Sequence, residues 1–276
     1  MSNETVSVYE KLQRAWRQQN SLLCVGLDPD SQRIPLHLRA LDQPYFEFCR
    51  AIVDATARYA CAFKPQAAHF AAVGRENELA QLLHYISDAY PGHLTILDAK
   101  RGDIGSTAAY YAQEAYDRYG ADVVTLNPYL GYESIEPYLA YADKGVVVLC
   151  RTSNADSNWL QNDPNDPLPV YQRVARRVKE WNTAGQCLLV AGATYPEELG
   201  VIRRLVGSMP LLVPGIGAQG GDLAAVMANG VDTAGTGLLI SSSRGILYAG
   251  EGESFADAAG QAARALRDEI NELRTG

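Results

Sequence analysis

Short runs of apolar and β-branched residues alternate with longer segments of helical periodicity along the whole chain. Continuous apolar runs of this length are typical of strands that are buried on both faces, as in a parallel sheet. The predicted strands cover residues 21–28, 60–66, 94–100, 122–128, 145–153, 187–193, 211–217 and 232–237.

The segments between these runs have the spacing and the end signals of helices. In STAAYYAQEAYDRYG, Ser106 or Thr107 is the expected N-cap and Gly120 the stop, and PVYQRVARRVKEWNTAG ends at Gly185. One more helix is expected before the first strand, over residues 8–19. Strands and helices that alternate in this way over ~250 residues favour a (β/α)8 TIM barrel over an open sheet. Without a linker or low-complexity tract, residues 1–276 are expected to form one domain, a barrel with an extra N-terminal helix.

Polar residues gather where the predicted strands end, and in such a barrel the active site lies at the carboxyl ends of the strands. They are Asp28, Lys64, Gln66, Asp98, Lys100, Asn127, Thr152, Ser153, Thr194, Gln219, Ser243 and Arg244. Residues 153–168, SNADSNWLQNDPNDPL, read as a long polar loop after the fifth strand. Loops of this length are often lids, so we expect this one to close over a ligand.

Opposite charges are concentrated in LDAKRGDIGS, at the end of the third predicted strand. Asp98 and Lys100 are two residues apart and should face the same way, while Asp103 follows at the turn. Lys64 and Asp28 add charges from neighbouring strands. Alternating carboxylates keep an ammonium protonated, so Lys100 is expected to be a proton donor. This disfavours a Schiff-base aldolase, whose lysine must be deprotonated, and a metal in the same space; a structural ion-pair network stays open.

A second group of residues suggests an anion site. GIGAQG satisfies G-x-G-x-x-G, but it follows the seventh predicted strand and does not open a βαβ unit. The stretches VPGIGAQGGD (213–222) and SSSRGILYA (241–249) instead predict the phosphate site that barrels build after their last two strands. Gln219 would supply a neutral donor and Arg244 a bidentate charge.

Composition narrows the classes of function. A net charge of −8 gives no basic surface for nucleic acid or an anionic membrane. The N-terminus does not read as a signal peptide and no apolar run approaches ~20 residues, so a cytoplasmic location is expected. The five cysteines form no C-x-x-C pair and are expected to be buried, reduced thiols. The four histidines lack the spacing of a zinc site, so no metal is suggested.

These residues carry a resemblance to a known family. DAKRGDIGST (98–107) resembles the D-x-K-x-x-D signature of orotidine 5'-phosphate decarboxylases. GLDPD, AFKPQ, RTSN, PGIGAQGGD and SSRGILYA resemble, in the same order, pieces of the longer-chain bacterial (type 2) subfamily. The resemblance covers essentially the whole chain. It implies decarboxylation of orotidine 5'-monophosphate (OMP) to uridine 5'-monophosphate (UMP) and carbon dioxide, the last step of de novo pyrimidine synthesis, without metal or organic cofactor.

The resemblance also implies roles for individual residues. Lys100 would protonate C6 of the pyrimidine and Asp98 would lie beside the substrate carboxylate, within a Lys64–Asp98–Lys100–Asp103 network. Asp103 would reach the neighbouring subunit's site, which implies a homodimer with shared active sites. The remaining implied contacts are Asp28 and Lys64 with the ribose, Ser153 with the pyrimidine, Gln219 and Arg244 with the phosphate, and Ile104 and Thr107 with the partner's site.

Some features do not match the family pattern or have no implied role. After RTSN the chain has ADSNWLQ in place of a short Pro-Gly turn, so the pyrimidine contact is less well matched than the charged residues. For Gln66, Arg101 and Asn127 a structural hydrogen bond is the favoured interpretation. Two rival functions stay open: a magnesium-dependent 3-keto-L-gulonate 6-phosphate decarboxylase with the same signature, and a silent phosphosugar- or nucleotide-binding barrel. The presence of all four charged positions argues against the silent barrel.

Overall fold

The computed structural model describes residues 6–163, 165–216 and 220–275 of the chain. Eight parallel strands pair in sequence order, and β8 closes on β1, so the predicted (β/α)8 barrel is confirmed. The strands are β1 Leu23–Leu27, β2 Ala62–Pro65, β3 Leu94–Arg101, β4 Val123–Leu126, β5 Gly145–Arg151, β6 Cys187–Ala191, β7 Leu211–Pro214 and β8 Leu238–Ser242.

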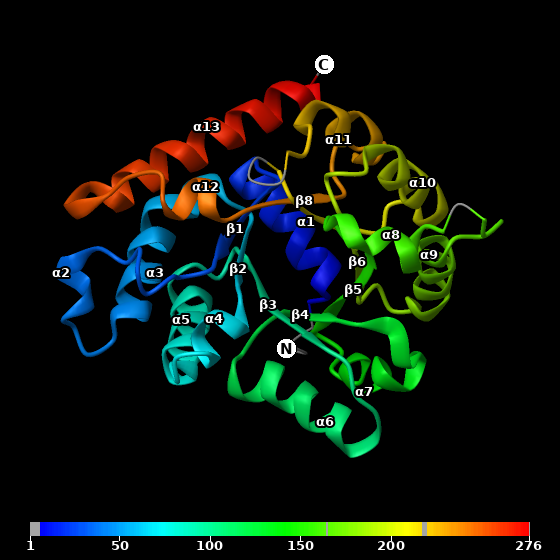
Figure 1. Ribbon diagram of the computed structural model, residues 1–276, viewed down its shortest axis with the longest axis horizontal. Helices are drawn as coiled ribbons and strands as arrows, with labels where there is room; N and C mark the ends of the chain where they lie inside the picture. The colour runs from blue at the N-terminus through cyan, green and yellow to red at the C-terminus, as the bar shows by residue number, and fades with distance from the viewer. Residues whose placement is uncertain (1–5, 164, 217–219, 276) are drawn as a thin grey trace, which may run out of the picture.

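Helices surround the barrel, with α13 along one side and α6 on the opposite side in the view of Figure 1. The longer helices are α1 Val8–Gln19, α3 Pro44–Thr56, α5 Glu76–Ala89, α6 Gly105–Gln113, α9 Val170–Trp181, α10 Pro196–Val206, α11 Leu223–Gly230 and α13 Phe255–Thr275. The shorter ones are α2 Leu36–Arg39, α4 Ala67–Ala71, α7 Glu136–Leu139, α8 Asn158–Gln161 and α12 Arg244–Leu247. Single turns within the described residues are η1 Ala57–Tyr59, η2 Glu114–Arg118, η3 Pro128–Leu130, η4 Tyr132–Ser134, η5 Ala155–Ser157 and η6 Gly252–Ser254.

The extra N-terminal helix, α1, contacts the amino ends of the strands. It starts at a capping box formed by Ser7 and Glu10. Lys11 Nζ lies 2.7 Å from Asp122, just before β4, and the Tyr9 hydroxyl donates to the Cys187 carbonyl at the start of β6. This end of the barrel is therefore covered, and the opposite, carboxyl end is free to hold a ligand.

Two predicted boundaries were wrong. The eighth strand is β8, Leu238–Ser242, and not residues 232–237. Residues 232–237 form a tight turn in which Asp232 Oδ1 accepts from the amides of Ala234 and Thr236, and Gly235 and Gly237 take positive φ angles of 69° and 85°. Short polar side chains and glycines favour such a turn, so the strand forms from the apolar run that follows. Helix α6 begins at Gly105, before the predicted Ser106 or Thr107 N-cap.

No helix in the described part of the chain is long and apolar enough to cross a membrane. All five cysteines are buried and unpaired, as predicted. Burial raises the pKa of the Cys24 thiol to about 12, so this side chain behaves as an inert apolar group.

Candidate active site

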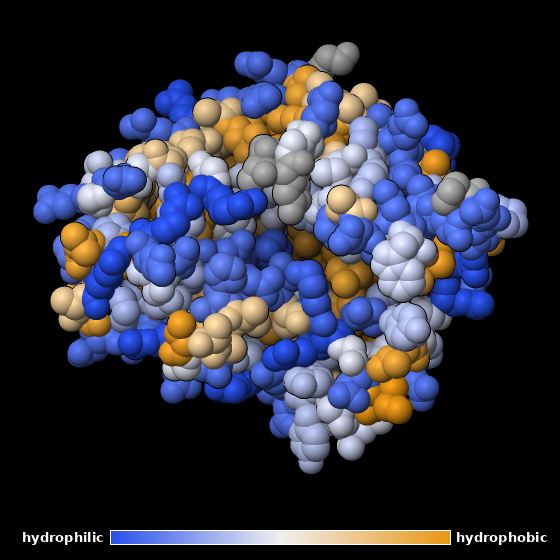
Figure 2. Space-filling view, in the orientation of Figure 1, coloured by the Kyte–Doolittle hydropathy of each residue, from blue (hydrophilic) through white to orange (hydrophobic). Residues whose placement is uncertain are grey.

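A cavity of about 520 Å³ opens at the carboxyl ends of the strands. Figure 2 shows this face of the molecule hollowed at its centre, with hydrophilic residues around the hollow. Six of the predicted site residues line the cavity: Asp28, Lys64, Asp98, Lys100, Ser153 and Arg244. Other lining residues are Leu149, Thr152, Asn154, Val190, Pro214, Gly215, Ile216, Ser241 and Ser243.

Asp98 holds one lysine on each carboxylate oxygen. Lys64 Nζ lies 2.8 Å from Oδ2, and Lys100 Nζ lies 2.6 Å from Oδ1. The side chains of Lys64 and Asp98 are 7% and 9% exposed, whereas the Lys100 side chain is 48% exposed. Lys100 is therefore the member of the cluster that a ligand can reach.

The cluster shifts the titration of its buried members. Burial by itself raises the pKa of Asp98, but the charges of Lys64 and Lys100 and their hydrogen bonds outweigh burial and hold this pKa well below its usual value. Burial lowers the pKa of Lys64, but Asp98 and Asp28 together raise it above its usual value. Both side chains are therefore charged at neutral pH.

Asp28 follows β1 and carries a carboxylate oxygen without a partner in the described part of the chain. Its Oδ1 is buried and has no hydrogen-bond partner among the described residues. A buried acceptor without a partner is unfavourable by about 1–3 kcal/mol, so this atom favours a ligand that donates a hydrogen bond.

The backbone of β3 is irregular where it presents Lys100. The pairing with β4 shifts between Leu97 and Arg101, and Lys100 has a φ of 47°, in the left-handed region. We predicted that Asp98 and Lys100 meet because they share one face of a regular strand. They do meet, but through this bulge, and such strained residues cluster at functional sites.

Thr125 stabilises the bulge, and sequence reasoning missed this residue. Its hydroxyl oxygen accepts from the amides of Ala99 and Lys100, at 3.0 and 2.9 Å, and the hydroxyl donates to Asp98 Oδ1 at 3.0 Å. One hydroxyl therefore holds both the backbone and the carboxylate of the cluster. The available signal was a single hydroxyl residue within the buried run VVTL of β4.

Asp103, Ile104 and Thr107 do not line this cavity. Asp103 Oδ1 accepts from the amide of Ile104 at 2.8 Å, and Ile104 and Thr107 lie exposed on the surface. Within one chain the charged network therefore has three members, and the fourth, Asp103, lies outside the cavity.

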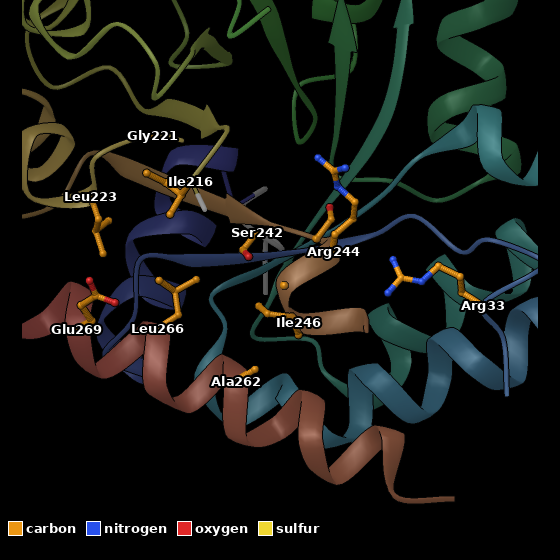
Figure 3. Close-up of a pocket in the computed structure, with 12 residues that line it drawn as sticks. Arg33, Ile216, Gly221, Leu223, Ser242, Arg244, Ile246, Ala262, Leu266 and Glu269 are labelled. Atoms are coloured by element: carbon orange, nitrogen blue, oxygen red, sulfur yellow. The ribbon is translucent and has the colours of Figure 1, made fainter. Parts of the chain in front are cut away.

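The segments after β7 and β8, where we predicted a phosphate site, form one end of the cavity. Arg244 begins α12, is exposed and makes no ion pair with a described residue. Arg244 also lines a neighbouring cavity of about 720 Å³, which Leu266 and Glu269 of α13 line as well. In Figure 3 the Arg244 side chain points away from α13. Gln219, the other predicted phosphate contact, lies outside the described residues.

The segment after β5, which we predicted to be a long polar loop over residues 153–168, contains two single turns of helix. Residues 155–161 form η5 and α8, and Arg151 at the end of β5 donates to Ser157 and Asn158 at 2.5 Å each. A buried guanidinium needs partners, and these polar side chains provide them. Ser153 lies between β5 and this folded segment, in the wall of the cavity.

The three rim residues without an assigned role make structural contacts. Gln66 and Asn127 accept from the amides of Ala68 and Tyr129, two residues further on. Arg101 pairs with Glu114 at 2.9 Å and also lies over the ring of Tyr111. Within the described ranges, no group of three or more His, Cys, Asp or Glu side chains is placed to hold a metal ion.

The fold and the site together define a (β/α)8-barrel enzyme with a charged pocket at the carboxyl ends of its strands. The family model described as "Orotidine 5'-phosphate decarboxylase / HUMPS family" matches residues 21–259, and the chain belongs to this family.

Relatives and solved structures agree over nearly the full length. The orotidine 5'-phosphate decarboxylase of Ralstonia pickettii is 58% identical over 266 residues, which cover 96% of this chain and 98% of the relative. The orotidine 5'-phosphate decarboxylase of Azoarcus sp. is 57% identical, and the match covers 95% of this chain and 98% of the relative. The structure of Leishmania donovani OMP decarboxylase has a TM-score of 0.85 at 37% identity and covers 98% of this chain and 100% of that one. The structure of a putative orotidine-monophosphate decarboxylase from Toxoplasma gondii has a TM-score of 0.89 at 36% identity and covers 99% of this chain and 98% of that one.

Proposed function

We propose that this protein decarboxylates OMP to UMP and carbon dioxide, the last step of de novo pyrimidine synthesis. The Lys64–Asp98–Lys100 cluster inside the barrel mouth is the observation that carries the proposal. Membership of the family and the names of relatives 54–58% identical support it.

Lys100 is the proposed general acid. When the bond between C6 and the carboxylate breaks, the electron pair stays on C6, where the pyrimidine ring delocalises it poorly. Charged groups that are fixed before the reaction can stabilise this carbanion without a cofactor as electron sink. The half-exposed ammonium of Lys100, held by Asp98, is suited to this task and then gives its proton to C6. Asp98 would lie beside the departing carboxylate.

The other cavity residues are proposed to bind the rest of the nucleotide. The unpartnered Oδ1 of Asp28 suits a ribose hydroxyl, with Lys64 beside it. Ser153 would contact the pyrimidine, and Arg244 with Gln219 the phosphate. Binding of the phosphate, remote from C6, supplies energy that holds the reacting groups in position.

The proposal includes a homodimer with shared active sites in the cytoplasm, each chain being a single barrel domain. Asp103 would complete the partner's charged network, with Ile104 and Thr107 beside it. In support, Ile104 and Tyr110 are exposed around the start of α6, at 49% and 71%. Apolar side chains that gather on a surface mark interfaces.

The deciding experiment is an ultraviolet assay of the purified, EDTA-treated protein. Addition of OMP should lower the absorbance as UMP forms. A magnesium-dependent 3-keto-L-gulonate 6-phosphate decarboxylase or a silent barrel would leave the absorbance unchanged. A Schiff-base enzyme would be trapped by borohydride as a lysine adduct, which we do not expect.

A further inference from the structure

The folded segment after β5 is attached to the barrel by a buried arginine. Arg151 donates to η5 and α8 through Ser157 and Asn158, pairs with Glu198 of α10 and lies 3.6 Å above the ring of Tyr195. Glu198 also accepts from Asn162, just after α8, at 2.7 Å. The two ends of α8 are therefore tied to α10 and to β5.

The last residue of α8 returns to the cavity wall. Gln161 Oε1 accepts from the Thr152 amide at 2.8 Å, and Gln161 Nε2 donates to Thr152 Oγ1 at 3.0 Å. Thr152 precedes Ser153 and lines the same cavity. The orientation of the Thr152 peptide therefore depends on Gln161, which does not line the cavity.

Ser153 is held from the opposite side by the end of β6. The Thr194 hydroxyl donates to the Ser153 carbonyl at 3.0 Å. A Cβ on Gly192 would lie 2.7 Å from both the amide nitrogen and the Cα of Ser153, closer than real Cβ contacts. The Ser153 backbone thus packs directly against Gly192, the residue after β6, and only glycine leaves room for it.

We infer that Gln161, Thr194 and Gly192 are positioning residues that set where Ser153 meets the base, and that α8 fixes this part of the cavity wall through Gln161 without lining the cavity itself. The inference rests on the proposed function, because Ser153 contacts the base only if the nucleotide lies as proposed. A polar group that the fold already holds in place recognises its ligand without an ordering penalty at binding. The phosphate and ribose subsites lie on other strands and do not depend on these contacts.

The test compares two ligands by titration calorimetry: UMP, and ribose 5-phosphate, which lacks the base. Gln161→Leu and Thr194→Val each remove the hydrogen bonds while keeping side-chain bulk. We expect each to raise the Kd of UMP about tenfold and to leave the Kd of ribose 5-phosphate unchanged. Gln172→Leu is the matched control, because the side chain of this α9 glutamine donates to the Tyr171 hydroxyl and lines no part of the described cavity; it should change neither Kd. The inference would be overturned if these variants raised the Kd of both ligands equally, or if they raised the Kd of neither.

Two further variants separate this inference from the proposed function. Ser153→Ala should raise the Kd of UMP and leave the Kd of ribose 5-phosphate unchanged. If it does not, the proposed place of the base is wrong. If Ser153→Ala weakens UMP while Gln161→Leu and Thr194→Val do not, the positioning inference alone fails. Gly192→Ala pushes on the Ser153 backbone without removing any hydrogen bond, so it should also weaken UMP selectively. Unchanged UMP affinity in this variant would contradict the proposed positioning of Ser153 even if Gln161→Leu failed to fold.

Discussion

Thr125→Val tests whether one hydroxyl holds the reactive cluster in place. The substitution keeps the shape of the side chain and removes three hydrogen bonds, from the Ala99 and Lys100 amides and to Asp98. Thr125 is 1% exposed, so water cannot easily replace them. Leaving buried donors without partners should lower the free energy of unfolding by about 3 kcal/mol, since each orphaned group costs about 1–3 kcal/mol.

Activity should fall in the same variant for a different reason. Lys100 holds its left-handed backbone against Thr125, and without this support the strained bulge can relax and move the ammonium away from C6. Small displacements of a reacting group are costly, and a loss of 1.4 kcal/mol of transition-state stabilisation corresponds to about a tenfold fall in kcat/KM. We therefore expect kcat/KM for OMP to fall at least about tenfold.

Thr95→Val provides the matched control. Thr95 is also 1% exposed, lies on β3 at the amino end of the barrel, and exchanges hydrogen bonds with Asp122 at 2.9 and 3.0 Å. We expect urea unfolding to show that the Thr95→Val variant is less stable than wild type, while its kcat/KM in the ultraviolet assay stays at the wild-type value. The reasoning is refuted if Thr125→Val keeps wild-type kcat/KM, or if Thr95→Val loses as much activity as Thr125→Val does.

Three other predictions follow from the cluster. Lys100→Ala should abolish turnover because the proton donor is gone, while calorimetry still detects UMP binding; near-native turnover would contradict the mechanism. When inactive Lys100→Ala and Asp103→Ala subunits are mixed, about a quarter of wild-type turnover should return, because half of the dimers are mixed and each holds one intact site; no recovery argues against shared sites. The pKa of Asp98 is lowered by its lysines, so its carboxylate stabilises the fold above its unfolded pKa of about 3.9, and this contribution is lost as the pH falls further. Between about pH 4 and pH 2, wild type should therefore lose stability to urea more steeply than Asp98→Asn does, and equal slopes would contradict this assignment.

The sequence predicted the barrel and most of its charged pocket because those signals are local. Each strand is a buried apolar run, and the residue that ends a strand must lie at the mouth, so Asp28, Lys64 and Asp98 meet there whatever the details of packing. The eighth strand was placed too early because residues 232–237 contain small residues that suit a strand or a turn. The hydrogen bonds of Asp232 decide between the two, and they depend on the folded loop.

The features that sequence reasoning missed depend on contacts between distant segments. The left-handed backbone of Lys100 requires the Thr125 hydroxyl from the next strand, 25 residues away in the chain. The helix α8 depends on the pairing of Arg151 with Glu198, 47 residues apart. Neither partner is marked by a local pattern, and residues 155–161 read as part of a loop until their contacts with the buried Arg151 are seen.

The two ends of the barrel use the same kind of side chains for different purposes. At the amino end, Asp122 pairs with Lys11 and accepts a hydrogen bond from Thr95, and α1 covers the group. At the carboxyl end, Asp98 likewise accepts a hydrogen bond from a threonine, Thr125, but it pairs with two lysines, and the group faces a cavity.

Charge explains how the carboxyl end accepts an anion. The charged side chains that line the cavity are Lys64, Lys100 and Arg244 against Asp28 and Asp98, three positive and two negative, which leaves one positive charge in a protein of net charge −8. A dianionic phosphate and a carboxylate can enter this pocket although the protein as a whole repels them, because field strength depends on nearby charges and distant ones are screened. The pairing with Asp98 fixes the lysines and still leaves the Lys100 ammonium open to the cavity, so in the proposed mechanism the same carboxylate that stabilises the fold would also orient the proton donor.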